Sequence, residues 1–361
     1  MKITGVKVFQ TDAIWRNWVF LELSTDEGIV GVGEASLEGK EVIVETAIRD
    51  LAEKYLVGKD PFDIEGHWLH MYRDEFYKGG PILSTAISGL ELALWDIVGK
   101  ALNQPVYNLL GGRCRDSIPA YANAWYIGER TSKGYAEKAR KVVKMGYKAL
   151  KFDPFGSAGR DMTREHEMAA IALVEAVRDA VGPDAEIMIE VHGRFSVYTA
   201  VKMARELERF RPYWYEEPVD MENVAAMAQV ARHCNIPIAT GERLFTKYCF
   251  ADLLDAGAVQ ILQPDIIHVG GILEIKKVAA MADAKYIPVA PHNPNGPVAC
   301  AATLHVDMGT SNFLIQEAFD DFDPPWRNDV VVNGPRVENG CYTLPRGPGL
   351  GLELNKDAIR E

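Results

Sequence analysis

Eight short apolar runs alternate with seven amphipathic stretches along residues 113–334. The runs start at steps of roughly 22 to 38 residues and read SIPAYAN (117–123), YKALKFD (147–153), AEIMIEV (185–191), YWYEEP (213–218), IPIATGE (236–242), AVQILQPD (258–265), IPVAPH (287–292) and FLIQEA (313–318). Such runs are typical of buried parallel strands, which need a crossover, usually a helix, between them. The alternation therefore predicts an α/β fold, a (β/α)7β-type TIM barrel, over 113–334.

The first 112 residues follow a different pattern. The segments 2–12 and 17–36 alternate apolar and polar residues, as antiparallel strands do. Three helical patterns follow, at 42–56, 64–77 and 84–102. Ser84 is a candidate N-cap for the last of these helices. The pattern predicts an α+β capping domain at 1–112, completed by the Gly- and Pro-rich segment 335–361.

The composition excludes several classes of protein. Hydrophobic residues make up 48% of the 361 residues and charged residues 25%, which is ordinary for a globular protein. The net charge of −12 leaves no basic stripe for nucleic acid. We find no apolar run near the roughly 18 residues of a membrane span, and no signal-peptide core. Five scattered cysteines without a CxxC pair indicate free thiols. We expect a cytoplasmic protein without a nucleic-acid or membrane partner.

Three glutamates stand at the ends of successive apolar runs. Glu190, Glu216 and Glu242 follow one another at steps of 26 residues. Because the carboxyl ends of barrel strands meet at one rim, these carboxylates are expected to converge, and like charges within a few Å resist joint ionisation. A cation between them would relieve this repulsion, and Mg²⁺ suits carboxylate oxygens best. Glu217 is an alternative to Glu216, but the equal spacing favours Glu216.

Every other predicted strand also ends in a polar side chain. These residues are Asn123, Lys151, Asp153, His192, Asp265, His292 and Glu317. A histidine titrates near neutral pH and suits proton transfer, and a carboxylate can hold its tautomer and stabilise the imidazolium. His292 and Asp265 end adjacent strands, so we expect them to form such a pair.

These residues and motifs resemble the enolase superfamily. The resemblance rests on KALKFDPFG, the three spaced glutamates, the QPD motif of Asp265 and the PHN motif of His292, and it extends over essentially the whole chain. Within the superfamily, the chain is most similar to the mandelate racemase subgroup. GYKALKFDPFG and EVHGRFS look most like sugar-acid dehydratases that act on gluconate or galactonate.

The resemblance implies a role for each strand-end residue. Mg²⁺ on Glu190, Glu216 and Glu242 would hold the substrate carboxylate, and His292 with Asp265 would remove the α-proton. Lys151 would stabilise the enediolate, together with Glu317 if its anionic neighbours keep it protonated. Substrate contacts are expected from Lys151, Asp153, Asn123 and Arg194. Relatives of this kind commonly form homo-oligomers, so we expect self-association.

One departure from the racemase pattern decides the expected reaction. Racemases of this subgroup carry a second lysine where this chain has Asp153, so inversion through two opposed bases is not expected. His192 lies two residues after Glu190, and strand alternation would place both on the same side. It could protonate a leaving β-hydroxyl, which predicts Mg²⁺-dependent dehydration of an aldonate such as gluconate or galactonate to a 2-keto-3-deoxy acid.

Other readings stay open at this point. A sugar-acid cycloisomerase or epimerase would use the same metal and base, a barrel aldolase would cleave a carbon–carbon bond, and a binding protein would have lost catalysis. By resemblance, Trp15, Trp18 and Glu38 of the N-terminal segments would cap the barrel mouth and select the substrate.

Overall fold

The computed structural model describes residues 1–343 and 346–360, and its N-terminal part is a three-stranded antiparallel sheet covered by helices. The strands are β1 (Ile3–Asp12), β2 (Asn17–Thr25) and β3 (Val30–Glu34), paired in that order. The helices are α1 (Glu41–Leu51) with a π-helical continuation (Ala52–Leu56), α2 (Ile64–Arg73), α3 (Gly80–Ala101) and the short α4 (Val106–Leu109).

Helix α3 is the core of this N-terminal part. It begins at Gly80 with a proline in its first turn, so the expected N-cap Ser84 is wrong: Ser84 lies inside the helix and is buried. The helix is long and apolar enough to cross a membrane, contrary to the sequence expectation, but 83% of its apolar window is buried inside the protein. Gly33 of β3 explains the close packing, because a Cβ there would lie 2.1 Å from the Gly89 carbonyl oxygen.

The rest of the chain forms the predicted barrel. Its parallel strands are β4 (Ile118–Ala122), β5 (Ala149–Phe152), β6 (Glu186–Glu190), β7 (Trp214–Glu216), β8 (Ile238–Thr240), β9 (Ile261–Leu262) and β10 (Gln316–Ala318). The seventh predicted run contributes single bridges instead of a regular strand: Val289 pairs with both Leu262 and Phe313. Because β10 pairs with β4, the ring closes.

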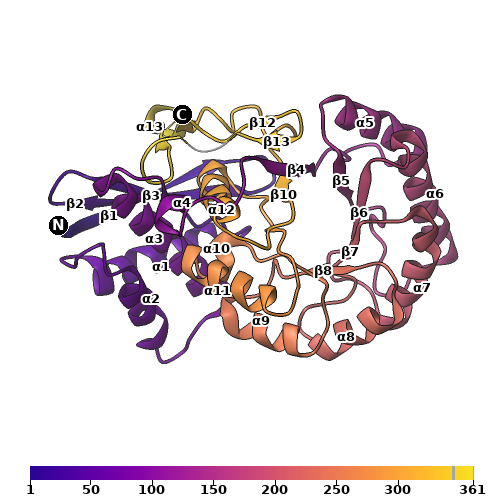
Figure 1. The fold of residues 1–361 in the computed structure, drawn as a ribbon, viewed down its shortest axis with the longest axis horizontal. Helices are drawn as coiled ribbons and strands as arrows, with labels where there is room; N and C mark the ends of the chain where they lie inside the picture. Colours follow the sequence, from indigo (N-terminus) through magenta and orange to yellow (C-terminus); the bar gives the residue numbers. More distant parts are fainter. Residues whose placement is uncertain (344–345, 361) are drawn as a thin grey trace.

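Helices surround the barrel strands (Figure 1). They are α5 (Ser132–Lys144), α6 (Arg164–Val181), α7 (Val197–Leu207) with a 3₁₀ turn (Glu208–Phe210), α8 (Val224–His233), α9 (Thr246–Asp255), the short α10 (Ile266–Val269), α11 (Ile272–Asp283) and α12 (Pro297–Met308). Helices α5 to α8 form the outer rim on the side away from the N-terminal sheet. Helices α10 to α12 lie between that sheet and the barrel.

Two buried glutamates connect the N-terminal part to the barrel. Glu34, at the end of β3, accepts backbone N–H bonds from Gly296 and Ala299 at the start of α12. Glu91 of α3 accepts in the same way from the first two residues of α11, Ile272 and Leu273. Carboxylates at helix N-termini satisfy amides that have no partner within the helix. The end of β3 is therefore held beside the barrel.

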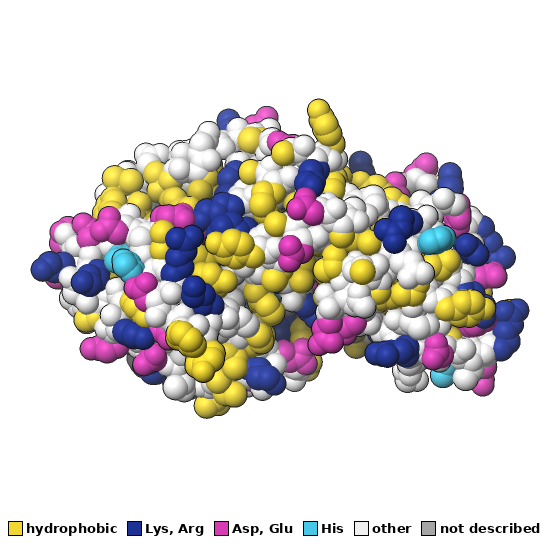
Figure 2. Space-filling view, turned by 90° about the horizontal axis from the view of Figure 1, so that it is seen from below, with side chains coloured by type: hydrophobic (Ala, Val, Ile, Leu, Met, Phe, Trp, Pro, Cys, Tyr) yellow, Lys and Arg dark blue, Asp and Glu magenta, His cyan; other side chains and the backbone are white. Residues whose placement is uncertain are grey.

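The C-terminal segment contacts both parts of the fold. It contains β11 (Val331–Val332), β12 (Val337–Glu338), β13 (Cys341–Tyr342), β14 (Glu353–Leu354) and α13 (Lys356–Arg360). β13 pairs with β4, the Leu350 amide donates to Asp96 of α3, and Lys356 forms an ion pair with Glu22 of β2. The division into domains at 1–112 and 113–334 stays a prediction. On the face shown in Figure 2, acidic and basic side chains are interspersed.

Candidate active site

A cavity of about 760 Å³ opens at the carboxyl ends of the barrel strands. Six of the predicted site residues line it: Asn123, Lys151, Glu190, His192, Glu242 and His292. The remaining wall is largely aromatic, aliphatic and proline side chains, and includes Trp15 and Glu38 from the N-terminal part. Trp18, expected beside them, is fully buried in the core instead. The polar floor and apolar wall are typical of a small-molecule site.

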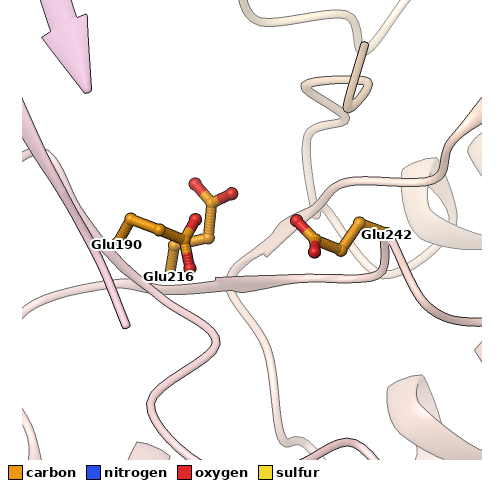
Figure 3. A group of neighbouring side chains, drawn as sticks. All are labelled: Glu190, Glu216 and Glu242. Carbon is orange, nitrogen blue, oxygen red and sulfur yellow. The ribbon is translucent and has the colours of Figure 1, made fainter. Parts of the chain in front are cut away.

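Glu190, Glu216 and Glu242 converge as predicted (Figure 3). Each offers a carboxylate oxygen within 4.8 Å of the other two. Among the described residues, none gives the buried Glu190 Oε2 a hydrogen bond. Burial and the neighbouring Glu190 raise the pKa of Glu216 to about 8. Three carboxylate ligands, with one oxygen of Glu190 that accepts no hydrogen bond, fit a divalent cation such as Mg²⁺.

Glu217, the alternative ligand, is not among the three carboxylates that converge. It has a left-handed backbone, with φ 42°, and its carboxylate lies 2.8 Å from the guanidinium of Arg243. The two adjacent glutamates therefore have different partners, Lys151 for Glu216 and Arg243 for Glu217. The three carboxylates identified from equal spacing are the ones that the structure brings together.

Lys151 and Glu317 form a buried ion pair behind the cavity floor. The Lys151 ammonium lies 2.5 Å from Glu216, 2.8 Å from Glu317 and 3.5 Å from Glu190. Burial alone would lower the pKa of Lys151, but Glu216 and Glu317 outweigh it, so the pKa is well above the usual value. Lys151 therefore carries a positive charge.

Glu317 was expected to donate a hydrogen bond only if its neighbours kept it protonated, and the surroundings of its carboxyl group favour the ionised form. Burial alone would raise its pKa, but Lys151 and His292 lower it to about 2. Its oxygens also accept hydrogen bonds from the Asn123 side chain, at 2.8 Å, and the Asn293 amide, at 2.7 Å. An ionised carboxylate only accepts hydrogen bonds. Glu317 therefore holds Lys151 and Asn123 in place and has no proton to donate.

His292 and Asp265 form the predicted pair. His292 Nδ1 lies 2.8 Å from Asp265 Oδ2, and the Asn295 amide donates to both Asp265 oxygens at 3.0 and 2.9 Å. Because a carboxylate only accepts, Nδ1 carries a proton and Nε2 faces Glu242, 3.2 Å away. Burial opposes protonation of the ring, but Glu242 and Glu317 outweigh it and raise the pKa of His292 to about 10. Positive charge held by Glu242 would lower this pKa.

His192 reaches the cavity for a different reason from the one predicted. β6 ends at Glu190, so strand alternation does not apply, and His192 instead has a left-handed backbone with φ 55°. Its amide donates to Glu190 Oε1 at 2.6 Å. Loss of hydration opposes protonation, but Glu190 and Asp153 outweigh it and raise the pKa of His192 to about 9. As for His292, positive charge held by the neighbouring glutamate, here Glu190, would lower this pKa.

Asp153 and Arg194 pair with each other instead of lining the cavity. Their predicted contact with substrate stays a prediction. Two groups were missed from the sequence: Asn295, which anchors Asp265, and the apolar wall of Trp125, Phe319 and Phe322. Asn295 follows His292 by three residues, and this proximity was the available signal.

Comparison with known proteins gives a consistent result. Residues 6–111 match the mandelate racemase/muconate lactonizing enzyme N-terminal domain, and residues 134–358 match the enolase C-terminal domain-like family. The chain is 40% identical to D-galactonate dehydratase of Cronobacter sakazakii, over 99% of this chain and 94% of that protein. It is 38% identical to D-gluconate dehydratase of Thermoproteus tenax, over 98% of this chain and 71% of that protein. A solved mandelate racemase/muconate lactonizing enzyme from Jannaschia sp. CCS1 superimposes with a TM-score of 0.95 at 34% identity, covering 100% of this chain and 97% of that one.

Proposed function

Because the chain belongs to the mandelate racemase/muconate lactonizing enzyme family of the enolase superfamily, we propose that it is a Mg²⁺-dependent dehydratase of an aldonate. D-Galactonate and D-gluconate, the acids in the names of its relatives, are the first candidates. The observation that carries the proposal is that two histidines, His192 and His292, line the same cavity as the carboxylates of Glu190 and Glu242.

Removal of the α-proton falls to His292. When bound to the three glutamates, a divalent cation supplies the positive charge that holds the substrate carboxylate and stabilises the enediolate. Lys151 is positively charged and lies beside Glu216, so its ammonium adds a hydrogen-bond donor for the substrate carboxylate. His292 Nε2 takes the proton from C2, and Asp265 holds the ring and stabilises the imidazolium.

Expulsion of the β-hydroxyl falls to His192. The electron pair left at C2 forms the C2–C3 double bond as the C3–O bond breaks, and His192 gives a proton to the departing oxygen, so that water leaves. The resulting enol takes a proton at C3 and loses the proton of its C2 hydroxyl, which gives the 2-keto-3-deoxy acid. The contact of His192 Nδ1 with Asp153, at 3.0 Å, supports the acid role, because a neighbouring carboxylate stabilises the protonated ring.

The charge of the cavity wall supports an aldonate over a diacid. Of the described residues that line the cavity, Lys151 is the only lysine or arginine, and it is committed to the floor. The wall also carries the carboxylate of Glu38, whereas the carboxylate of Asp323 is paired with Arg16 and Arg327. Away from the catalytic floor, a second carboxylate on the substrate would therefore meet the like charge of Glu38 and no lysine or arginine among the described lining residues.

A panel of C5 and C6 aldonates and aldarates with Mg²⁺, scored for 2-keto acid, tests the proposal. We expect turnover of at least one aldonate, with loss of 18 mass units as water. Turnover without a change of mass would favour the cycloisomerase or epimerase, and release of pyruvate would favour an aldolase. Silence across the panel would contradict dehydration. Self-association and the cytoplasmic location stay predictions.

A further inference from the structure

Asp153 occupies a position with three donors around one carboxylate. It follows β5, and its Oδ1 accepts the Phe155 amide at 2.8 Å. Its Oδ2 lies 3.0 Å from His192 Nδ1 and pairs with the Arg194 guanidinium. Both oxygens are therefore occupied by protein donors, and the side chain is nearly buried.

Arg194 holds this carboxylate, and each of its three guanidinium nitrogens has a partner within the protein. Nε donates to the Val191 carbonyl at 2.7 Å, Nη1 donates to the Gly156 carbonyl at 2.6 Å, and Nη2 pairs with Asp153. The planar guanidinium thus joins the loop after β6 to the loop after β5. Its fixed fork of donors makes that connection rigid.

The His192 ring depends on Asp153 for its orientation. The side chain is about half exposed, so packing alone leaves it free to rotate. Within the described part of the chain, the polar contacts of its ring are both at Nδ1, with Asp153 at 3.0 Å and Arg194 at 3.2 Å. Arg194 only donates and Asp153 only accepts, and we assign a proton to Nδ1 because its contact with Asp153 is the shorter of the two. The other ring nitrogen, Nε2, takes no part in these two contacts, and His192 lines the cavity.

We propose that Asp153, locked by Arg194, is a positioning residue that orients His192 for proton donation. The pair repeats the construction of Asp265 and His292, with a carboxylate at 3.0 Å in place of 2.8 Å and Arg194 in place of Asn295 as its anchor. The inference rests on the proposed function, in which His192 expels the hydroxyl. It also gives Asp153 and Arg194 a role without substrate contact.

Asp153→Asn tests the inference in the Mg²⁺-loaded full chain. The asparagine amide must point its NH₂ either at the Phe155 amide or at His192 and Arg194, so donor faces donor in both orientations. With an aldonate that the wild type turns over, we expect kcat for dehydration to fall at least tenfold. KM and the exchange of the C2 proton in D₂O, which needs only His292, should stay within threefold. Asp161→Asn, eight residues further along the same loop and bonded to the Ser196 hydroxyl, is the matched control and should change nothing.

Three results would overturn the inference. A rise in KM with kcat kept would indicate substrate contact, a parallel fall of exchange and dehydration would indicate a general structural role, and a fall in kcat below tenfold would leave His192 independent of Asp153. If Asp153→Asn does not fold, Arg194→Lys, which keeps the charge but loses the planar fork, is read by the same criteria.

A direct measurement separates this inference from the proposed function. If the wild type dehydrates no sugar acid, the proposed function fails, but the His192 tautomer can still be read from ¹⁵N-labelled imidazole at a pH where the ring is neutral. A proton on Nδ1 in the wild type that moves to Nε2 in Asp153→Asn supports the positioning. A wild-type ring protonated at Nε2 alone overturns it.

Discussion

At the scale of single residues, substitutions of the two cavity histidines are expected to affect dehydration and C2 proton exchange differently. His292→Asn removes the base, so both dehydration and C2 proton exchange should disappear. His192→Asn leaves His292 and Asp265 intact, so dehydration should slow by about 100-fold or more while exchange persists, because general acid catalysis contributes on that order. Proton NMR in D₂O measures exchange, and a keto-acid assay measures turnover. Loss of exchange in His192→Asn would contradict separate roles.

The adjacent glutamates at the end of β7, Glu216 and Glu217, give a second prediction. Glu216→Gln removes one of the three converging carboxylates, so the Mg²⁺ dissociation constant should rise by more than about tenfold. Glu217→Gln is the control, because Glu217 is paired with Arg243 outside the cluster, and it should change the constant by less than about threefold. Isothermal titration of both variants checks this. Equal losses would contradict the assignment of Glu216.

Spacing and residue type were enough to predict which carboxylates converge, because a strand end fixes a position on the barrel rim. They were not enough to predict protonation. The sequence left the protonation of Glu317 as a condition, and Lys151 and His292 lower its pKa, which favours the ionised form. That outcome depends on three-dimensional distances between β5, β10 and the loop at His292, which no local pattern contains.

At the scale of elements, the packing of α12 on α4 predicts a pH-dependent stability. His305 of α12 is fully buried, and its Nδ1 accepts the Tyr107 amide at 3.2 Å. Burial lowers the pKa of His305 to about 4. The folded state therefore binds fewer protons than the unfolded state between about pH 4 and 6.5, so stability is lost as the pH falls through that window.

His305→Asn isolates this effect, because asparagine can still accept the Tyr107 amide but does not titrate. From pH 7.5 to pH 4.5, the wild type should lose about 2–3 kcal/mol of unfolding free energy more than the variant. Urea unfolding at the two pH values measures it. Between pH 7.5 and 9, the two proteins should show parallel profiles. Equal losses on acidification would mean that His305 is not the titrating group.

Element boundaries were predicted less well than element order. The run at 287–292 was expected to be a regular strand, but it contributes only single bridges at Val289 and His292. Helix α3 starts at Gly80, four residues before the expected Ser84 cap, and Pro81 in the first turn was the signal that was missed. Strand ends depend on pairing with distant neighbours, whereas the alternation of strand and helix is carried by local hydrophobic pattern.

At the scale of the whole molecule, the cavity is built by segments far apart in the sequence. Glu34 caps α12 from 262 residues away, and this contact holds the end of β3 beside the barrel. Glu38 follows β3 and lines the cavity together with Lys151 and His292. The sequence pattern predicted both the N-terminal part and the barrel. It did not predict that the end of β3 lies beside the barrel, because the capping contacts that hold it there join residues far apart in the sequence.

The charge of the cavity wall predicts that the protein distinguishes substrates by the group at C6, the end far from the C1 carboxylate. D-Galactonate and D-galactarate differ only at C6, where the second acid carries a carboxylate. With Lys151 committed to Glu216 and Glu317, and with the carboxylate of Glu38 in the wall, the aldonate should be favoured in kcat/KM by at least about 30-fold, or about 2 kcal/mol. Glu38→Gln removes one like charge and should narrow the ratio by about threefold, chiefly by raising turnover of galactarate. Steady-state kinetics of both acids with both proteins measures this. Comparable wild-type turnover of the two acids would contradict a wall that rejects a second carboxylate. An unchanged ratio of the two kcat/KM values in Glu38→Gln would contradict the part assigned to Glu38.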